Sequence, residues 1–205
     1  MGKDMARTLQ SAFGAAMTIG RSGRSDGAAG VTIRERSNVA VASVAVRKGK
    51  AEALIAKIKT RTGLELPTGP RLVADGHLSF LWMAPGQWLA MADAEDGPAF
   101  AADLTADLVG LASITDQSDG RALIRVSGAN VRDALAKGCM VDLHPSAFQV
   151  GDTAITPIAL LTVQVTRLPD AADGATFELA VMRSFALNLW HWLEASAAEY
   201  GVVVI

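Results

Sequence analysis

One stretch, SITDQSDGRALIRVSGANVRDALAKGCMVDLHPSAF at residues 113–148, carries the strongest local signals in the chain. An extended run at 114–117 leads to the turn Ser118-Asp119-Gly120, and a second apolar run follows at 121–126. Asp-Gly between two such runs is typical of a tight turn, so we expect a β-hairpin here. Alternation along the second strand separates two faces, with Ala122, Ile124 and Val126 on one and Leu123 and Arg125 on the other.

A short helix is expected directly after this second strand, over residues 129–137, with apolar side chains on one side. Ser127 is placed to cap the free N–H groups at the helix start, and Gly128 to let the turn pack tightly. Gly138 is a typical helix stop. The stretch therefore predicts strand, turn, strand and helix, followed by a loop that contains His144 and Pro145.

The same stretch resembles the segment that the gamma subunit of heterotetrameric sarcosine oxidase shares with folate-binding aminomethyltransferases. The matching pieces are DQS at 116–118, VSG at 126–128, LAKGC at 135–139 and DLHP at 142–145. Three more pieces agree, GVTIRER at 30–36, APGQWL at 84–89 and RSFA at 183–186. The resemblance runs from about residue 31 to the C-terminus, and the residues before it match nothing.

The resemblance implies a non-catalytic gamma subunit that supports assembly with alpha, beta and delta subunits. Such complexes oxidise the N-methyl group of sarcosine to give glycine and hydrogen peroxide, and they pass the one-carbon unit to tetrahydrofolate. FAD, covalently held FMN, NAD and zinc are implied on the other subunits, with no cofactor on this chain. The one folate-contacting candidate that the resemblance offers is Asp116, whose alternative role is to cap a turn.

Composition fits a globular protein of 205 residues in which half of the residues are apolar. No run approaches the roughly 18 apolar residues of a membrane helix, and no secretory signal is recognisable. The net charge of −2 gives no electrostatic case for nucleic acid. The single cysteine, Cys139, excludes an internal disulfide and favours a cytoplasmic protein.

The order of predicted elements indicates an α+β fold. Strands at 39–46, 78–83, 88–91 and 111–116 alternate with helices at 50–62 and from Asp96-Gly97-Pro98 onward, which is the split βαβ plan. A second series has strands at 121–126, 158–166, 177–181 and 202–205 and a helix at 185–200 that Ser184 caps. We expect two ferredoxin-like halves of antiparallel sheet with helices on one face, which is the aminomethyltransferase type that the resemblance implies.

Three segments follow from this order. Residues 1–30 form a flexible N-terminal arm, 31–117 a first half and 118–205 a second half, and the two halves pack as one unit. An amphipathic helix is expected at 5–17, and the Gly/Ser/Arg-rich run at 20–30 should be mobile. The arm is either a disordered tail or a segment that becomes ordered on a partner, with Leu9 and Phe13 as anchors.

Candidate contact residues for a partner lie near loops or on a second apolar face. On the last helix Phe185, Leu189, Trp192, Leu193 and Ser196 form the expected core face, whereas Leu187 and Trp190 point elsewhere. Either these two residues contact another chain, or a loop of the same chain buries them. The full set of candidates is Trp82, Trp88, His144, Leu187 and Trp190.

Motifs for catalysis are scarce. His77, His144 and His191 share no metal-ligand spacing with Cys139, which is best interpreted as a small buried residue. Phosphate-binding loops, dinucleotide fingerprints and a nucleophile elbow at Ser127 are missing from the sequence. The sequence therefore predicts no catalytic or metal-binding residue. One alternative stays open, a stand-alone folate-binding aminomethyltransferase-like protein. A nucleic-acid module would have to rely on Phe80 and Trp82, and the acidic balance argues against it, so we expect neither nucleic acid nor a membrane as a partner.

Overall fold

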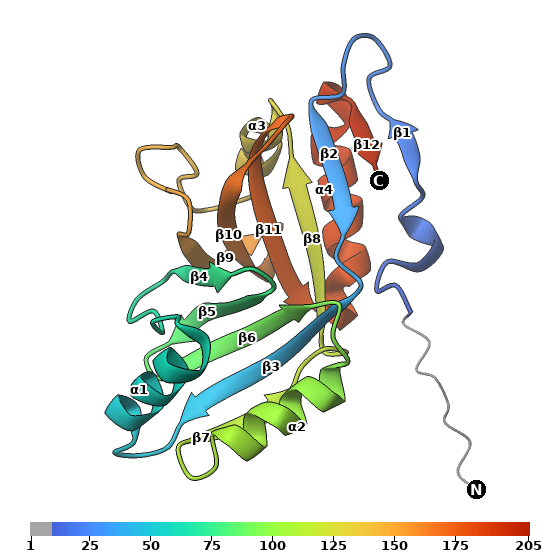
Figure 1. Ribbon diagram of the computed structural model, residues 1–205. Coiled ribbons are helices and arrows are strands. Elements are labelled where there is room, and N and C mark those ends of the chain that lie inside the picture. Colours follow the sequence, from blue (N-terminus) through green and yellow to red (C-terminus); the bar gives the residue numbers. More distant parts are fainter. Residues whose placement is uncertain (1–9) are drawn as a thin grey trace, which may run out of the picture.

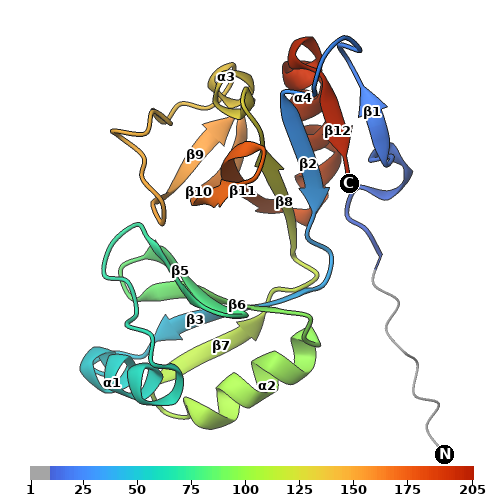
Figure 2. The ribbon, with the colours of Figure 1, turned by 45° about the horizontal axis from the view of Figure 1, so that its top comes forward.

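The computed structural model describes residues 10–205, which form two β-sheets, each with helices on one face (Figures 1 and 2). The small sheet has the strand order β4 (Leu72–Asp75), β5 (Leu78–Ala84), β6 (Gln87–Asp93), β3 (Val39–Val46), β7 (Ala112–Asp116). The large sheet has the order β1 (Gly20–Ser22), β12 (Val202–Val204), β2 (Val31–Glu35), β8 (Arg121–Ser127), β11 (Gly174–Met182), β10 (Leu161–Ala171), β9 (Thr153–Ile158). The predicted mixed α+β class is confirmed.

Both helices of the small sheet begin where the sequence predicts, and the predicted end of the first one is confirmed. Helix α1 (Ala51–Thr62) ends at Gly63, whose left-handed backbone, with φ of 76°, suits a residue that lacks Cβ. Helix α2 (Gly97–Asp107) is capped by Asp96, whose carboxylate accepts a hydrogen bond from Ala99 N at 3.0 Å. Both helices bury apolar side chains in one core with the sheet, among them Leu54, Ile58, Phe100 and Leu104.

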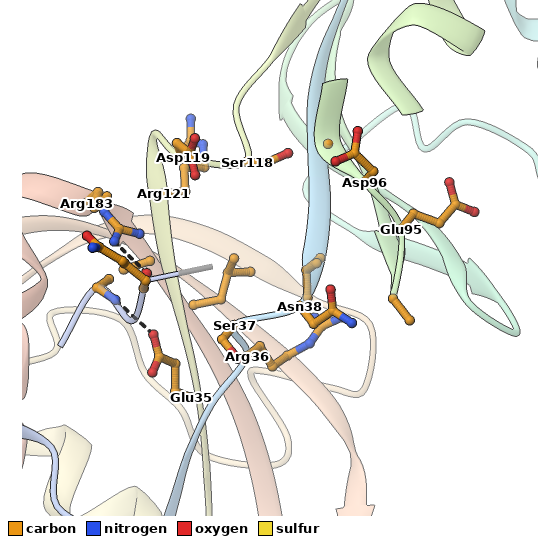
Figure 3. A pocket seen from close by; sticks show the side chains of 17 residues that line it. Glu35, Arg36, Ser37, Asn38, Glu95, Asp96, Ser118, Asp119, Arg121 and Arg183 are labelled. Carbon is orange, nitrogen blue, oxygen red and sulfur yellow. Dashed lines mark hydrogen bonds between the residues drawn. The ribbon is translucent and has the colours of Figure 1, made fainter. Parts of the chain in front are cut away.

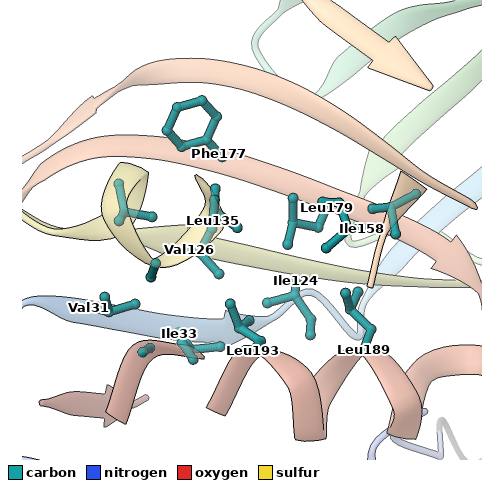
Figure 4. Packing of buried hydrophobic residues seen from close by; sticks show 14 of the residues in the cluster. Val31, Ile33, Ile124, Val126, Leu135, Ile158, Phe177, Leu179, Leu189 and Leu193 are labelled. Carbon is teal, nitrogen blue, oxygen red and sulfur yellow. The ribbon is translucent and has the colours of Figure 1, made fainter. Parts of the chain in front are cut away.

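The large sheet packs one face against α3 (Val131–Ala136) and α4 (Ala186–Ala197) (Figure 4). The alternation predicted for β8 is confirmed, because Ala122, Ile124 and Val126 lie in this core while Leu123 lies in another. The neighbouring strand β11 contributes to the same core, because Leu179 pairs with Ile124 and Phe177 pairs with Val126. This core therefore joins β2 and Phe13, from near the start of the chain, to strands and helices from residue 121 onward.

The two sheets meet through their remaining faces. Val41, Leu81, Leu89 and Met91 of the small sheet share a buried cluster with Leu123 and Ala180 of the large one. Backbone hydrogen bonds also cross between the sheets, from Leu72 N to Gly151 O at 2.7 Å and from Thr153 N to Pro70 O at 3.1 Å. The halves thus pack on each other as a helix layer, two sheets and a second helix layer.

The predicted hairpin at 114–126 is wrong, because β7 and β8 lie in different sheets. Ser118, in the link between them, is hydrogen-bonded to β3, because its Oγ accepts a hydrogen bond from Val41 N at 2.9 Å. Gln117 N donates to Val41 O at 2.7 Å. These contacts span more than 70 residues of sequence, so the Asp-Gly signal could not reveal that the chain changes sheet here.

The predicted cap at Ser127 is also wrong. Ser127 is the last residue of β8 and its hydroxyl donates to Asp173 Oδ2 at 2.8 Å, while α3 starts at Val131. The tight packing predicted for Gly128 is confirmed: its φ is +127°, and a Cβ there would come within 2.3 Å of Gly30 O. Glycine is needed because two backbones cross at this point.

The prediction of a single strand at 158–166 is wrong, because two strands, β9 and β10, share this region. The chain reverses between β9 and β10 at Ala159 and Leu160, whose φ values of 50° and 70° are left-handed. Because this turn contains neither glycine nor asparagine, the apolar pattern runs through it unbroken. Strand β4 was likewise not predicted.

At the last helix, the α-helical part begins at Ala186 after a 3₁₀ turn (Arg183–Phe185), and Ser184 provides no side-chain cap. Phe185 is 46% exposed, so its placement on the core face was wrong, while Leu189 and Leu193 are buried as expected. The 3₁₀ turn changes the helical phase at its start, which moves Phe185 outward.

The N-terminal segment packs on the large sheet as far as it is described. Residues 1–9, including Leu9 and the first five residues of the expected helix, lie outside the described residues. In the rest of 5–17 a 3₁₀ turn (Gly14–Ala16) forms in place of an α-helix, and Phe13 is buried at 1% exposure. Strand β1 pairs with β12. The flexibility of the arm stays a prediction, but its course from residue 10 differs from that of a free tail.

Strand β2 also departs from the predicted division. Residues 31–35 were assigned to the first half, yet β2 lies between β12 and β8 in the large sheet. Register pairs Val31 with Val202 in parallel and Thr32 with Ser127 in antiparallel orientation. The segment before β3 therefore belongs structurally to the second half.

Candidate functional site

A polar cavity of about 210 Å³ lies where the chain crosses between the two sheets (Figure 3). Its walls come from three crossing segments, which are the β2–β3 link, the β6–α2 link and the β7–β8 link. Arg183 and the N-terminal segment close it further. The polar side chains labelled around it are Glu35, Arg36, Ser37, Asn38, Glu95, Asp96, Ser118, Asp119, Arg121 and Arg183.

Arg36 is held in place by carboxylates from both sheets. Its guanidinium donates to Glu178 Oε2 of the large sheet at 2.5 Å and forms an ion pair with Asp93 of the small sheet. Burial disfavours the charged form of Arg36, but the two carboxylates outweigh it and raise its pKa. Arg36 therefore joins the halves and has its charge satisfied within the chain.

The N-terminal segment is tied to the rim of the cavity by two polar contacts. Ala12 N donates to Glu35 Oε1 at 3.0 Å, and Arg183 donates to the carbonyl of Gln10 at 2.7 Å (Figure 3). Phe13, the next residue, is buried in the core of the large sheet. The segment thus forms part of the wall, which the sequence did not indicate.

Arg121 differs from the other arginines of the cavity. Its Nε is buried and has no hydrogen-bond partner among residues 10–205, and burial alone lowers its pKa. It lines the polar cavity and also a second, more apolar cavity of about 310 Å³ on the open face of the large sheet. A buried donor without a partner is costly, so this residue marks a place suited to an external acceptor.

Asp116 holds the β7–β8 link. Its Oδ1 accepts hydrogen bonds from the Ser118 backbone N at 2.9 Å and from Ser118 Oγ at 2.6 Å. This is the turn-capping role that was the alternative to folate binding. Asp116 does not line the polar cavity, although Ser118 does. Its contact with folate stays a prediction.

Two of the predicted contact residues are buried by their own chain. Trp88 is 5% exposed and its Nε1 donates to Pro67 O at 2.8 Å. Trp190 is 2% exposed and shares the large-sheet core with Phe13. Both rings therefore offer almost no area to another chain, and for Trp190 this agrees with the alternative that the same chain buries it.

The other three contact candidates remain accessible. Leu187 is 45% exposed at the start of α4. His144 is exposed and its Nδ1 lies 2.7 Å from Ser146 Oγ. Trp82 is partly buried in the small-sheet core, and its carbonyl accepts from Gln164 Nε2 at 3.1 Å. Their contact with a partner stays a prediction.

Sequence reasoning missed a group of exposed apolar residues beside the second cavity. We call this group the apolar patch; it comprises Ile155, Leu160, Met182 and Phe185, which are 49%, 98%, 47% and 46% exposed. The patch went unnoticed because Leu160 was assigned to a continuous strand and Phe185 to a helix core face, while Ile155 and Met182 lay outside the predicted elements. Knowledge of the turn at 159–160 would have been needed to find it.

Metal-binding side chains are not clustered in the described part of the chain. Among residues 10–205 no cluster of three His, Cys, Asp or Glu side chains could hold a metal ion. Cys139 is half-buried, and burial raises the pKa of its thiol. Within the same residues no helix is long and apolar enough to cross a membrane.

Comparison with solved structures defines the class of fold. A chain of the heterotetrameric sarcosine oxidase from Corynebacterium sp. U-96, in complex with pyrrole 2-carboxylate, superposes with a TM-score of 0.73 and 24% identity, covering 87% of this chain and 88% of that one. Aminomethyltransferase T of the glycine cleavage system from Bartonella henselae superposes with a TM-score of 0.60 and 16% identity, covering 86% of this chain and 48% of that one. The fold is thus the two-sheet α+β fold of the aminomethyltransferase type.

Sequence comparison then identifies the family. Residues 47–199 match the sarcosine oxidase, gamma subunit family, and the chain belongs to this family. The gamma subunit of sarcosine oxidase from Corynebacterium sp. (strain P-1) is 28% identical over 173 residues, which are 83% of this chain and 82% of that protein. The gamma subunit from Arthrobacter sp. is 28% identical over 175 residues, 85% of this chain and 83% of that protein. The resemblance noted in the sequence is confirmed.

Proposed function

We propose that this chain is a non-catalytic subunit that supports assembly of a heterotetrameric sarcosine oxidase. The complex oxidatively demethylates sarcosine to glycine with tetrahydrofolate and oxygen, and it releases methylenetetrahydrofolate and hydrogen peroxide. Its partners are the alpha, beta and delta subunits. FAD, FMN, NAD and zinc are bound by those subunits, and tetrahydrofolate is a co-substrate of the complex.

One observation carries the proposal: the structural match covers nearly all of both chains. The superposition with the sarcosine oxidase chain takes in 88% of that chain, whereas the superposition with aminomethyltransferase T takes in 48%. This chain therefore corresponds to a whole subunit of an oxidase complex better than to the full extent of a folate-dependent transferase. Family membership over residues 47–199 supports the same role.

The finer description of the fold, two ferredoxin-like halves, is also a proposal. The small sheet orders its strands β5-β6-β3-β7, and helices α1 and α2 follow β3 and β6. The split βαβ plan has this arrangement. In the large sheet β12, β8, β11 and β10 follow a corresponding order, with β2 inserted between β12 and β8. This insertion supports a division in which residues 31–35 join the second half.

The direct test is purification of a tagged copy of the chain from its host, grown on sarcosine. We expect yellow material that contains three further chains and produces hydrogen peroxide when sarcosine is added. A colourless single chain, under conditions in which the oxidase is expressed, would contradict the proposal.

The alternative, a stand-alone folate-binding protein, is tested on the purified chain alone. Calorimetry with tetrahydrofolate should give no binding heat, and saturating ligand should leave the midpoint of thermal unfolding unchanged. Micromolar binding by the isolated chain would favour the alternative.

A further inference from the structure

The apolar patch lies on the face of the large sheet that is turned away from α3 and α4. Register puts Met182 opposite Arg121 and Ile155 opposite Gln164, so these side chains share one face. The small sheet covers the neighbouring part of this face, where Leu123 and Ala180 are buried. Toward the 159–160 turn the cover ends, and the apolar side chains stay open to solvent.

The turn presents its most exposed side chain under backbone strain. Ala159 and Leu160 both have left-handed φ values, which residues with a Cβ adopt rarely. Leu160 is nevertheless a leucine, and it is 98% exposed. A strained residue that holds a large apolar group in water indicates a function for that group rather than a contribution to the fold.

The cavity beside the patch also contains a polar atom without a partner. Gln164 is 4% exposed, and its Nε2 donates to Trp82 O at 3.1 Å and to Thr153 Oγ1 at 3.2 Å. Since the Trp82 carbonyl can only accept, the amide orientation is fixed. Its Oε1 is then buried without a hydrogen-bond partner among the described residues. The Gln164 amide oxygen is therefore an unsatisfied acceptor in the wall beside the cavity.

Arg121 brings to the same cavity a positive charge that makes no ion pair among the described residues. Its Nε has no partner, and Arg121 forms no ion pair within residues 10–205. The residues that line this cavity include no acidic side chain. Apolar groups, a free acceptor and a free cation thus occur together on one open face.

We propose that the apolar patch is the surface on which another subunit of the oxidase docks, with apolar side chains over Leu160 and Met182 and a carboxylate against Arg121. The proposal rests on the proposed function as a complex subunit. Apolar groups surrounded by a few convergent polar groups are what a protein interface of this kind requires.

A second copy of the same chain fits the patch less well. In a twofold dimer the same surface appears on both sides. The patch would then bring two Arg121 side chains into one interface, and its lining offers no carboxylate to either. Charge complementarity therefore favours a different chain that brings an acidic residue.

The test is co-expression of this chain with the other three subunits from the same host, followed by capture through a tag on one of those subunits. Leu160→Asp and Met182→Asp should each weaken association about 30-fold or more, as expected for a central interface residue. Val109→Asp is the matched control, because Val109 is 78% exposed but lies just beyond α2 in the other half. The control should assemble like the wild type, and all three variants should keep the wild-type melting temperature as isolated chains.

Arg121 is tested separately for its charge. Arg121→Gln should weaken association about tenfold, which is the size of effect expected when one charged interface contact is lost. Arg121→Lys keeps the positive charge and should therefore bind much more tightly than Arg121→Gln. If Arg121→Gln and Arg121→Lys weakened association equally, the contact would depend on the shape of the arginine side chain and not on its charge.

The outcomes separate the two proposals. If the wild-type chain joins no complex, the proposed function fails and the docking surface fails with it. If the wild type assembles but Leu160→Asp and Met182→Asp assemble equally tightly, the docking surface is wrong and the function stands. Loss of assembly with Val109→Asp to the same extent also overturns the surface. A wild-type dimer that both patch variants dissociate, with the oxidase intact, would identify a second copy as the occupant.

Discussion

The small sheet takes its strands from one continuous run, β3 to β7, whereas the large sheet joins β1 and β2 near the start of the chain to β8–β12 near its end. In the small sheet, helix starts and stops at Asp96 and Gly63 follow local sequence signals. In the large sheet, the decisive contacts link residues far apart, such as Gly30 with Gly128. The small sheet, built from one continuous segment, can therefore be predicted from local sequence. The large sheet, built from distant segments, carries the exposed apolar patch.

The largest expected effect comes from the core of the large sheet. Trp190→Ala should lower the free energy of unfolding by about 4 kcal/mol, because a fully buried aromatic side chain is lost and a cavity remains. Urea unfolding followed by circular dichroism measures this. Trp192→Ala, at a partly buried position on the same helix, is the control and should cost clearly less. Equal costs at the two positions would contradict the burial of Trp190.

A second substitution tests the backbone crossing that the large sheet requires. Gly128→Ala should destabilise the protein by about 3 kcal/mol, since φ is +127° and the new Cβ would meet Gly30 O at 2.3 Å. Gly120→Ala, where the closest atoms lie at 3.4 Å and φ is not left-handed, should be nearly neutral. Thermal unfolding of both variants measures the difference in stability. An unchanged melting temperature for Gly128→Ala would show that the backbone around this crossing can move to accommodate a Cβ.

Substitutions in the small sheet and its helices should lower the free energy of unfolding by less than those in the large sheet. Asp96→Ala removes the cap of α2 and should cost about 1 kcal/mol. Hydrogen exchange should rise in the first turn of α2 and stay unchanged in β10 and β11. Glu95→Ala changes an adjacent carboxylate that does not cap the helix, so it serves as the control. Faster exchange throughout the large sheet would mean that the halves do not respond separately.

The smallest effect has the opposite sign. Leu160→Gly should stabilise the chain by about 0.5 kcal/mol, because relief of the left-handed strain slightly exceeds the added flexibility of glycine in the unfolded state. Leu161→Gly, in the adjacent strand, should destabilise it. Differential scanning calorimetry resolves the two. If Leu160→Gly also destabilises, the turn is not strained and the argument for a functional leucine weakens.

Much of the fold could be predicted, because short-range signals determine it locally. The alternation in β8 and the ends of α1 and α2 depend on residues within a few positions of each other. The sheet change after Asp116 depends on Ser118 bonding to Val41, which lies 77 residues away. No local pattern contains that information.

The candidate site was less predictable than the fold. Helical phase placed Trp190 off the expected core face and left open whether another chain or the same chain covers it; in the structure it belongs to the large-sheet core, which includes Phe13 from the N-terminal segment. Leu160 was predicted to lie in a strand, because its turn lacks glycine. In both cases a distant or strained segment determines the exposure of the side chain, and local sequence does not contain that information.

The position of β2 between β12 and β8 has a consequence for how the protein is made on the ribosome. The small sheet is complete once the nascent chain has emerged to residue 116, and it can fold while synthesis continues. Strands β1 and β2 emerge first, but β12, their shared neighbour, comes last. Synthesis must therefore pass residue 204 before the earliest strands are fully paired, and during that time their unpaired edges are open to chaperones.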